Sequence, residues 1–374
     1  MKLPKHIPQL DVLRGIAVLI VMLYHIIDIV PRLHLRPIFS LGYAGVDLFF
    51  VLSGFLITGI LVRSKDSKRY FKNFYARRAL RIWPLYYALL FFTFVALPVI
   101  HPSLKASIFE LCHPWQAFPF FLQNLTIHRQ AFDTLRVTWS LAIEEQFYLV
   151  WPVIVWLAPP RMLKPLALSA LFLSMAVRWS VLIGLIPPLT IYMNTLTRLD
   201  GLSLGAFLAL WIPQADERVV RLAGIAAVGL ALPATIYLGA VHPGHWAFFS
   251  IVAACFAGML CLAITTEKLS KIGLLKYTGK ISYALYLIHV PVFAFGAAYG
   301  LGNILFPHSP IMAEVALFAI SFVTCYALAA ASWRFFESKI LKLKSRFEYG
   351  LPSTAGVPAS PNVSGSPVAD RIAD

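Results

Sequence analysis

The sequence predicts an all-α polytopic membrane protein, a bundle of about ten transmembrane helices with both termini in the cytosol. Composition is the first reason: 59% of the 374 residues are hydrophobic, 13% are charged and the mean hydropathy is +0.75, which lies outside the range of soluble proteins. The second is a series of apolar runs long enough to cross a bilayer. The third is an uneven distribution of Lys and Arg between the segments that join these runs.

The apolar runs define the expected helices. A spanning helix needs roughly 20 mainly apolar residues. The first run, Val12 to Val30, is too long and too polar for a cleaved signal peptide, so we expect it to be retained. An aromatic stretch, Trp115 to Leu125, is too short to cross and is typical of an interfacial or re-entrant segment. Runs of spanning length lie at about 11–30, 41–62, 80–100, 139–158, 164–187, 190–212, 219–240, 246–265, 280–300 and 311–333.

Basic residues determine the expected orientation. The N-terminus and every second joining segment carry 23 Lys and Arg residues, whereas the joining segments of the opposite side carry 5. Because positive charge stays in the cytoplasm, we expect the first set to face the cytosol. This arrangement accounts for most of the formal net charge of +15, so we expect the lipid bilayer and not nucleic acid as the partner.

The expected organisation is one membrane domain followed by a tail. Residues 1–346 hold all the apolar runs, and residues 347–374, rich in Pro, Ser, Ala and Gly, predict a disordered cytosolic tail. The four cysteines show neither a disulfide framework nor the spacing of metal ligands. We therefore expect no metal site.

Polar residues interrupt the first apolar run. Ionisable groups in a spanning helix cost at least a few kcal/mol near its centre and indicate a functional site. Arg14 and His25 are eleven residues apart, so they share one helix face, separated by about 16 Å along the axis. Asp28 follows one turn later, where a carboxylate can fix the tautomer of the His25 imidazole. The alternative is a structural histidine that bonds to a neighbouring helix.

Other runs place charged residues at the depth that we expect for His25, in the outer part of the bilayer. Opposite charges at one depth predict a polar, water-accessible cavity, and the alternative is a purely structural network of ion pairs. The residues concerned are Glu144, Glu145, Asp47, Arg198 and Asp200.

The densest basic segment precedes the third run. Arg78 and Arg81, at positions i and i+3, point from one side of a helix that we expect to begin here, and Arg77 lies beside them. The planar fork of arginine suits phosphate oxygens, so the segment predicts a site for a phosphorylated cytosolic ligand. Topology-setting charge or anionic lipid would explain the same cluster.

Five sequence elements follow one another across residues 6–340. They are Leu10–Gly15 with His25 ten residues after its Arg, Gly45–Thr58, Arg77–Pro84, Trp139–Tyr148 and Ile281–Pro291. In this order the elements resemble the acyltransferase 3 family of membrane acyltransferases, which decorate O-antigen, peptidoglycan, nodulation factors and antibiotics. One of the elements alone would be a weak signal, but the ordered set is specific.

The resemblance implies an enzyme of the bacterial inner membrane that transfers an acyl group, commonly acetyl from acetyl-CoA, to a hydroxyl of a carbohydrate or lipid-linked glycan. Acyl-CoA would be a donor substrate and not a permanently bound cofactor. His25 would be the essential histidine, Arg14 its partner, and Arg78 with Arg81 the donor-side pair. Many relatives carry an extracytoplasmic hydrolase-like domain after the last span, so a separate extracytoplasmic transferase is a further expected partner.

Joining this chemistry to the layout gives a set of expected roles. A hydroxyl must lose its proton as it attacks a thioester, and histidine is the usual base, although an acyl-histidine intermediate is equally open. Asp28 or Glu144 would orient the imidazole. The expected catalytic residues are His25, Arg14, Glu144, Glu145 and Asp28; the donor contacts are Arg77, Arg78 and Arg81; and the substrate contacts are Asp47, Arg198, Asp200, Tyr148 and His289.

Two other classes of function have to be compared with the enzyme. A proton-coupled transporter or a flippase of a glycolipid or small molecule also needs midplane carboxylates and a histidine, but such proteins often show inverted repeats. We find no internal symmetry of this kind in the sequence. A non-catalytic membrane partner or sensor needs no ordered set of polar elements.

Overall fold

The predicted fold class is confirmed by a computed structural model, in which every regular element of the described residues is helical. Asp28, which was expected to orient the histidine, and the tail from Gly350 onward lie outside the described residues. The structure describes residues 1, 4, 6–27, 29–34, 40–126, 133–187, 191–242 and 245–349.

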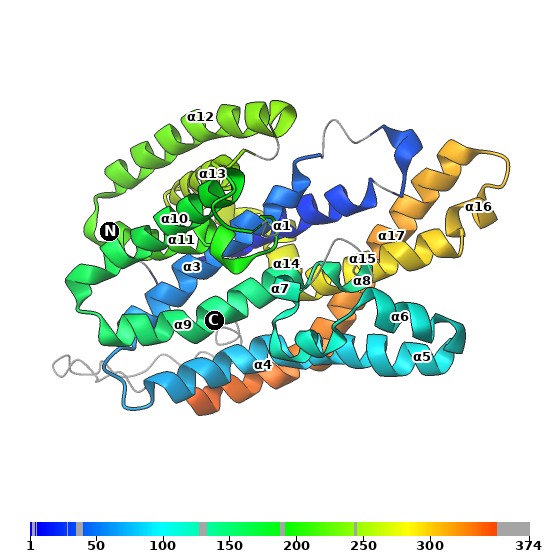
Figure 1. Cartoon of the computed structure of the whole chain (residues 1–374), viewed down its shortest axis with the longest axis horizontal. Coiled ribbons are helices and arrows are strands. Elements are labelled where there is room, and N and C mark those ends of the chain that lie inside the picture. The colour runs from blue at the N-terminus through cyan, green and yellow to red at the C-terminus, as the bar shows by residue number, and fades with distance from the viewer. Residues whose placement is uncertain are drawn as a thin grey trace, which may run out of the picture.

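Long helices run roughly parallel or antiparallel to one another along the long axis of the molecule (Figure 1). The longer ones are α1 (Pro8–Ile26), α3 (Gly45–Arg63), α4 (Tyr70–Phe91), α9 (Trp139–Leu157), α10 (Pro160–Leu182), α11 (Asp200–Trp211), α12 (Glu217–Val241), α13 (Phe248–Ile264), α15 (Ser282–Ala298) and α17 (Pro310–Ser332). The shorter ones are α5 (Leu97–Ile100), α6 (Lys105–Leu111), α7 (Gln123–Thr126), α8 (Asp133–Arg136), α14 (Gly273–Lys280), α16 (Leu301–Leu305) and α18 (Ser338–Leu341).

The helices support a polytopic membrane protein, while the exact number of spans stays a prediction. In the described part of the chain, 7 helices are long and apolar enough to cross a membrane, or 8 if α14 and α15, which meet at a bend of 75°, form one span. Each of the ten predicted runs contains a helix, but α11 and α13 have only 12 and 17 residues. The cytosolic location of both termini also stays a prediction.

The predicted run 190–212 is not one continuous helix. Residues 191–199 form turns and a short 3-10 helix, Thr195–Thr197, and α11 begins only at Asp200. The Thr197 hydroxyl donates to the carbonyls of Ile191 and Asn194, and the Asn194 side chain accepts from the Leu196 amide. Such local side-chain bonds to the backbone compete with helical hydrogen bonds, which explains why the helix starts late.

The third predicted run begins earlier than its apolar residues suggest. Helix α4 starts at Tyr70, continues through a π-helical turn (Phe92–Ala96) and joins α5, so the span covers Tyr70–Ile100. The expected position of Arg78 and Arg81 at the beginning of this helix is therefore wrong. They lie two to three turns inside it, roughly 12 to 17 Å from its first residue. The helix can begin before its apolar residues because basic side chains are compatible with a helix that lines a polar cavity.

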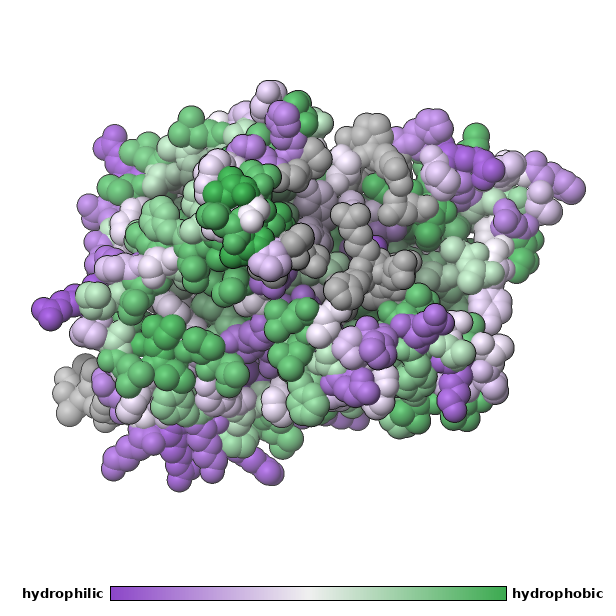
Figure 2. All heavy atoms as spheres, viewed as in Figure 1, coloured by the Kyte–Doolittle hydropathy of each residue, from purple (hydrophilic) through white to green (hydrophobic). Residues whose placement is uncertain are grey.

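Helices at the centre of the bundle differ from those at its edge. In the span that contains α3, 67% of its most apolar stretch is buried inside the protein. The corresponding share is 17% in α10 and 22% in α12. The exposed apolar side chains of α10 and α12 suit contact with lipid tails. Figure 2 shows hydrophobic residues over much of one face, with hydrophilic ones gathered at the lower left, beside the orange segment that follows α17 in Figure 1.

Glycines allow α3 and α11 to pack backbone to backbone. A Cβ atom added to Gly54 would lie 2.0 Å from the Leu202 carbonyl oxygen, and one added to Gly205 would lie 2.1 Å from the Val51 oxygen. Gly201 and Gly205 form the G-x-x-x-G spacing that lets membrane helices approach closely. This crossing holds α3, which carries Asp47 and Ser53, against the start of α11.

Candidate active site

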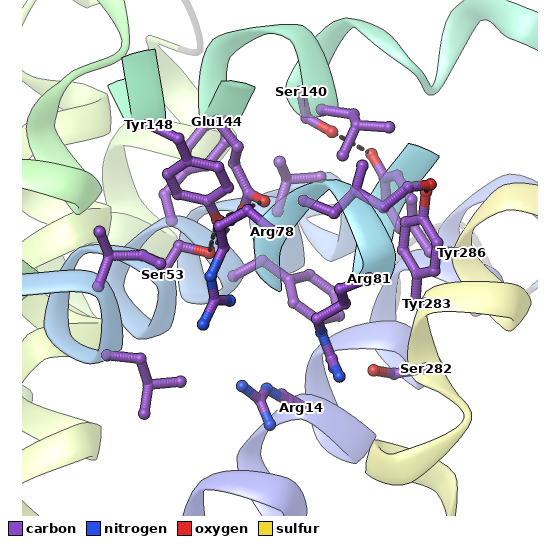
Figure 3. A pocket seen from close by; sticks show the side chains of 17 residues that line it. Arg14, Ser53, Arg78, Arg81, Ser140, Glu144, Tyr148, Ser282, Tyr283 and Tyr286 are labelled. Carbon is purple, nitrogen blue, oxygen red and sulfur yellow. Dashed lines mark hydrogen bonds between the residues drawn. The ribbon is translucent and has the colours of Figure 1, made fainter. Parts of the chain in front are cut away.

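Side chains from α1, α3, α4, α9 and α15 enclose a cavity inside the bundle (Figure 3). It has a volume of about 110 Å³, which is room for several water molecules. Its polar lining consists of Arg14, Ser53, Arg78, Arg81, Ser140, Glu144, Tyr148, Ser282, Tyr283 and Tyr286. The sequence placed some of these residues at the inner boundary and others in the outer bilayer, but the structure brings them to one site.

Three arginines are the main feature of the cavity. The guanidinium groups of Arg78 and Arg81 on α4 and of Arg14 on α1 point into a common space (Figure 3). Arg14 forms an ion pair with Asp11 at 2.9 Å. Arg78 and Arg81 form no hydrogen bond or ion pair with any residue that the structure describes. A desolvated guanidinium without a protein acceptor is a strong binding group for an anion.

A carboxylate and two hydroxyls face these arginines. Glu144 on α9 accepts hydrogen bonds from the Ser53 hydroxyl at 2.8 Å and from the Tyr148 hydroxyl at 3.1 Å, and Tyr148 also lies 3.1 Å from the Ser53 hydroxyl. Both Glu144 oxygens therefore bond across the α3–α9 contact or within α9, and neither bonds to His25. The expectation that Glu144 orients the His25 imidazole does not match this geometry.

A pair of histidines lies between α1 and α15. The Nδ1 atom of His25 lies 3.2 Å from the Nε2 atom of His289, and the two ring centroids are 5.0 Å apart. Neither histidine lines the cavity, but Tyr286 joins the two places: it lines the cavity and its ring lies 5.8 Å from that of His289. In the described ranges, no cluster of three or more His, Cys, Asp or Glu side chains could hold a metal ion.

The helices α1 and α15 pack against each other between the cavity and the histidine pair. Arg14 and His25 lie eleven residues apart on α1, and Ser282 and His289 lie seven residues apart on α15. In each helix the first residue lines the cavity, and the second belongs to the histidine pair. The expected shared face of Arg14 and His25 thus corresponds to one helix–helix contact.

A second group of charged residues is buried away from the cavity. Arg198 is 1% exposed and its Nη2 atom donates to both Asp47 oxygens at 3.0 Å. Arg178 is 0% exposed and donates to both Asp200 oxygens, at 2.7 and 2.9 Å. The Ser250 hydroxyl also donates to Asp200. The expected substrate contacts Asp47, Arg198 and Asp200 therefore have the geometry of the alternative interpretation, a structural ion-pair network.

Aromatic rings complete the surroundings of Arg198. Its Nε and Nη1 atoms have no hydrogen-bond acceptor, but its guanidinium carbon lies 3.7 Å from the ring centroid of Phe249 and 5.1 Å from that of Tyr192. Cation–π contacts of this kind stabilise a desolvated guanidinium. These contacts leave Arg198 no access to a ligand.

Two further expected residues lie away from the cavity. Arg77 donates to the Lys344 carbonyl at 3.4 Å and lies over the Tyr349 ring, so it contacts the C-terminal segment. Glu145 accepts from the Trp83 indole at 3.1 Å. Of the predicted donor contacts, only Arg78 and Arg81 line the cavity.

Comparison with known proteins agrees with the motifs. A family model described as an acyltransferase domain, the acyltransferase 3 model, matches residues 7–330. The chain belongs to the acyltransferase 3 family. The matched region contains every helix that contributes to the cavity and both histidines.

Three relatives of this acyltransferase 3 protein are similar over most of its length. O-acetyltransferase OatA of Staphylococcus aureus is 30% identical over 94% of this chain and 60% of the relative. Peptidoglycan O-acetyltransferase OatA of Listeria monocytogenes is 28% identical over 77% and 49%, and putative peptidoglycan O-acetyltransferase YrhL of Bacillus subtilis 30% over 90% and 55%. The chain thus spans about half to three-fifths of these relatives' length. No solved structure matches.

Sequence reasoning missed several residues of this family member's charged sites. Arg178 interrupts an apolar run, and the rule that an ionisable residue in a span needs a partner would have singled it out. Other missed residues lie inside the motifs, namely Ser53, Ser282 and Tyr286. Because their side chains are uncharged, the sequence does not indicate how deep in the bilayer they lie or toward which helix they point. Only the contacts between helices reveal that they line the cavity.

Proposed function

We propose that the protein is an O-acetyltransferase of the bacterial inner membrane, which takes an acetyl group from cytosolic acetyl-CoA and transfers it to a carbohydrate or lipid-linked glycan hydroxyl at the outer side. Arg78 and Arg81 carry the proposal, because their guanidinium groups open into a cavity and have no acceptor among the residues that the structure describes. Membership in the acyltransferase family favours this enzyme over a transporter or flippase. The names of the relatives support acetyl as the group and peptidoglycan-like carbohydrate as the acceptor.

The arginines suit the donor. Coenzyme A carries phosphate groups, and the guanidinium fork of arginine binds phosphate oxygens through paired, charge-assisted hydrogen bonds. Arg14 is partly neutralised by Asp11 at 2.9 Å, so Arg78 and Arg81 supply most of the uncompensated charge. The thioester arm would follow the contact between α1 and α15 toward His25.

His25 supplies the base in this proposal. The acceptor oxygen attacks the thioester carbonyl carbon, a carbon–oxygen bond forms, the carbon–sulfur bond breaks, and His25 removes the hydroxyl proton and returns it to the departing thiolate. A route through an acyl-histidine uses the same imidazole as nucleophile. On the outer side, the acetyl group passes to the glycan directly or to a separate extracytoplasmic transferase.

Transfer by purified protein in liposomes tests this function. With radiolabelled acetyl-CoA and fragments of peptidoglycan-type glycan, we expect label to appear on the glycan. Gln at position 25 keeps a donor and an acceptor but cannot take the proton, so His25→Gln should insert and bind CoA yet lose at least about 100-fold in turnover. Near-normal turnover by well-folded His25→Gln protein would defeat the proposed chemistry, and wild-type protein that labels no glycan would defeat the acceptor class.

Cysteine labelling tests the orientation on which a cytosolic donor depends. The native cysteines are all buried, which gives a low background. Ser309→Cys, before α17, should react with an impermeant thiol reagent in intact cells, whereas Ser270→Cys, between α13 and α14, should react only after the membrane is opened. Labelling of Ser270→Cys in intact cells would reverse the orientation.

A further inference from the structure

We propose that a surface hollow between α14 and the turn that follows α17 binds the phosphate headgroup of an anionic phospholipid. This site is separate from the arginine cavity and goes beyond the proposed transfer reaction. The surface hollow has a volume of about 540 Å³, against about 110 Å³ for the arginine cavity. Its lining comes from Tyr277 on α14 and from residues between Ala330 and Ser338.

Small side chains and a change of helix type form the surface hollow. Ala330 and Ala331 leave room at the end of α17. The chain then continues through a π-helical turn, Trp333–Glu337, and such turns frequently lie at functional sites. The hydroxyls of Thr278 and Tyr326 lie 3.1 Å apart and link α14 to α17. The two walls of the surface hollow are therefore joined by a direct contact.

Two cationic side chains lie at the surface hollow. Arg334 lines it, and the Lys280 ammonium lies 5.0 Å from the centroid of the Trp333 ring. Neither cationic group forms a hydrogen bond or an ion pair with any residue that the structure describes. Glu337, the acidic residue nearest to Arg334 in the sequence, is 8% exposed and accepts from the Ser332 hydroxyl at 2.9 Å. Guanidinium and ammonium groups bind phosphate oxygens, so the surface hollow is complementary to a phosphate.

The aromatic and basic residues also fit the level of the lipid headgroups. Tyr277 and Trp333 combine an apolar ring with a polar tip, and such side chains gather at the membrane–water interface. Lys280 and Arg334 belong to two of the basic segments that the sequence predicts to face the cytosol. Basic pockets between membrane helices on that side bind anionic headgroups. Charge and position together match a phospholipid phosphate.

Apolar side chains beside the surface hollow favour a lipid over a soluble phosphate. Leu274 on α14 is 73% exposed, Phe335 in the π-helical turn 64% and Leu328 on α17 49%. Exposed apolar side chains of membrane helices contact acyl chains. A phospholipid therefore satisfies both the cations and the apolar surface, whereas inorganic phosphate would satisfy only the cations.

Native mass spectrometry of protein released from vesicles with equal parts of phosphatidylglycerol and phosphatidylcholine tests the site. Wild-type protein should retain phosphatidylglycerol in preference to phosphatidylcholine. One basic residue near the membrane surface strengthens binding of anionic lipid about fivefold, so Arg334→Gln should lower the preference about fivefold and Arg334→Gln/Lys280→Gln about 25-fold. Ala331→Leu fills the surface hollow without changing any charge and should lower the preference as well. Equal retention of both lipids by wild-type protein would overturn the proposal.

A matched control separates this site from the general attraction of a basic protein to anionic lipid. Arg221→Gln removes the same charge from an exposed position on α12, whose apolar side chains suit lipid, and should keep the wild-type preference. Equal losses in Arg221→Gln and Arg334→Gln, or no loss in Ala331→Leu, would show diffuse attraction alone and overturn the proposal. Excess inorganic phosphate should leave the lipid bound, and displacement would assign the surface hollow to a soluble anion instead. Because none of these measurements uses turnover, failure of the proposed function would leave their result unchanged.

Discussion

Two pairs of arginines in this bundle have opposite surroundings. Arg178 and Arg198 are fully buried, and each is matched to a carboxylate at 2.7 to 3.0 Å. Arg78 and Arg81 are partly buried, line a cavity and have no acceptor among the described residues. Since an unpaired buried charge is costly, a closed pair serves the scaffold, whereas an open pair has to be completed by water or a ligand. Whether a buried arginine has a carboxylate partner in the protein therefore separates structural arginines from candidate ligand-binding ones better than the extent of its burial does.

The largest effect should come from breaking the closed pair. Asp47→Ala leaves Arg198 charged and buried, and we expect a loss of about 3 to 5 kcal/mol in the free energy of unfolding. Thermal unfolding and the yield of monodisperse protein in detergent measure this loss. Replacing both partners, Asp47→Leu with Arg198→Met, should recover most of the stability because no lone charge remains. If Asp47→Ala unfolded like wild type, the pair would not be part of the scaffold.

An intermediate effect should follow removal of the open pair, and it should appear in activity. Arg78→Ala and Arg81→Ala each remove a charge-assisted contact worth about 1.5 to 3 kcal/mol, so kcat/KM for acetyl-CoA should fall about 10- to 100-fold while thermal stability stays the same or rises slightly. Arg78→Lys should recover only part of the loss because a point charge lacks the bidentate fork. An unchanged rate dependence on acetyl-CoA in both Ala variants would exclude the cavity as the donor site.

The smallest effect should come from a hydroxyl that faces the arginines across the cavity. Ser53→Ala removes one of the hydrogen bonds that hold Glu144, a change worth about 1 kcal/mol or about fivefold in turnover. Ser169→Ala, on exposed α10, where the hydroxyl bonds only to its own helix, is the matched control and should have no effect. A loss as large as that of Arg78→Ala would assign Ser53 a direct role in the reaction.

Much of the fold could be predicted from the sequence because apolar runs of spanning length record where helices form. The starts of helices were less predictable. Helix α4 begins at Tyr70, ten residues before its apolar run, and α11 begins at Asp200, ten residues after its run. In both cases polar side chains decide the boundary: those of α4 can turn toward a protected cavity, and those near Thr197 bond to their own backbone.

Some residues of the cavity lining could be predicted from the sequence, but their arrangement could not. Arg14, Arg78, Arg81 and Glu144 were all expected to be functional, and all line one cavity. Counting residues from assumed membrane boundaries placed Glu144 in a separate, outer layer. The structure keeps the start of α9 at Trp139, but it begins α4 at Tyr70, which moves Arg78 and Arg81 two to three turns into the helix. The contact between His25 and His289 joins residues 264 positions apart, so the sequence suggested Asp28 or Glu144, and not His289, as the neighbour of His25.

The most direct test of the account compares the affinity for acetyl-CoA with stability in the same set of proteins reconstituted in nanodiscs. Lys72→Ala removes a charge from α4 at an exposed position and controls for the net charge of this segment. We predict that the Arg78→Ala/Arg81→Ala double variant binds acetyl-CoA at least about 100-fold more weakly than wild type, with an unchanged melting temperature in the absence of ligand, and that Lys72→Ala binds almost normally. Equal dissociation constants for all three proteins would contradict the assignment of the open arginine pair to the donor.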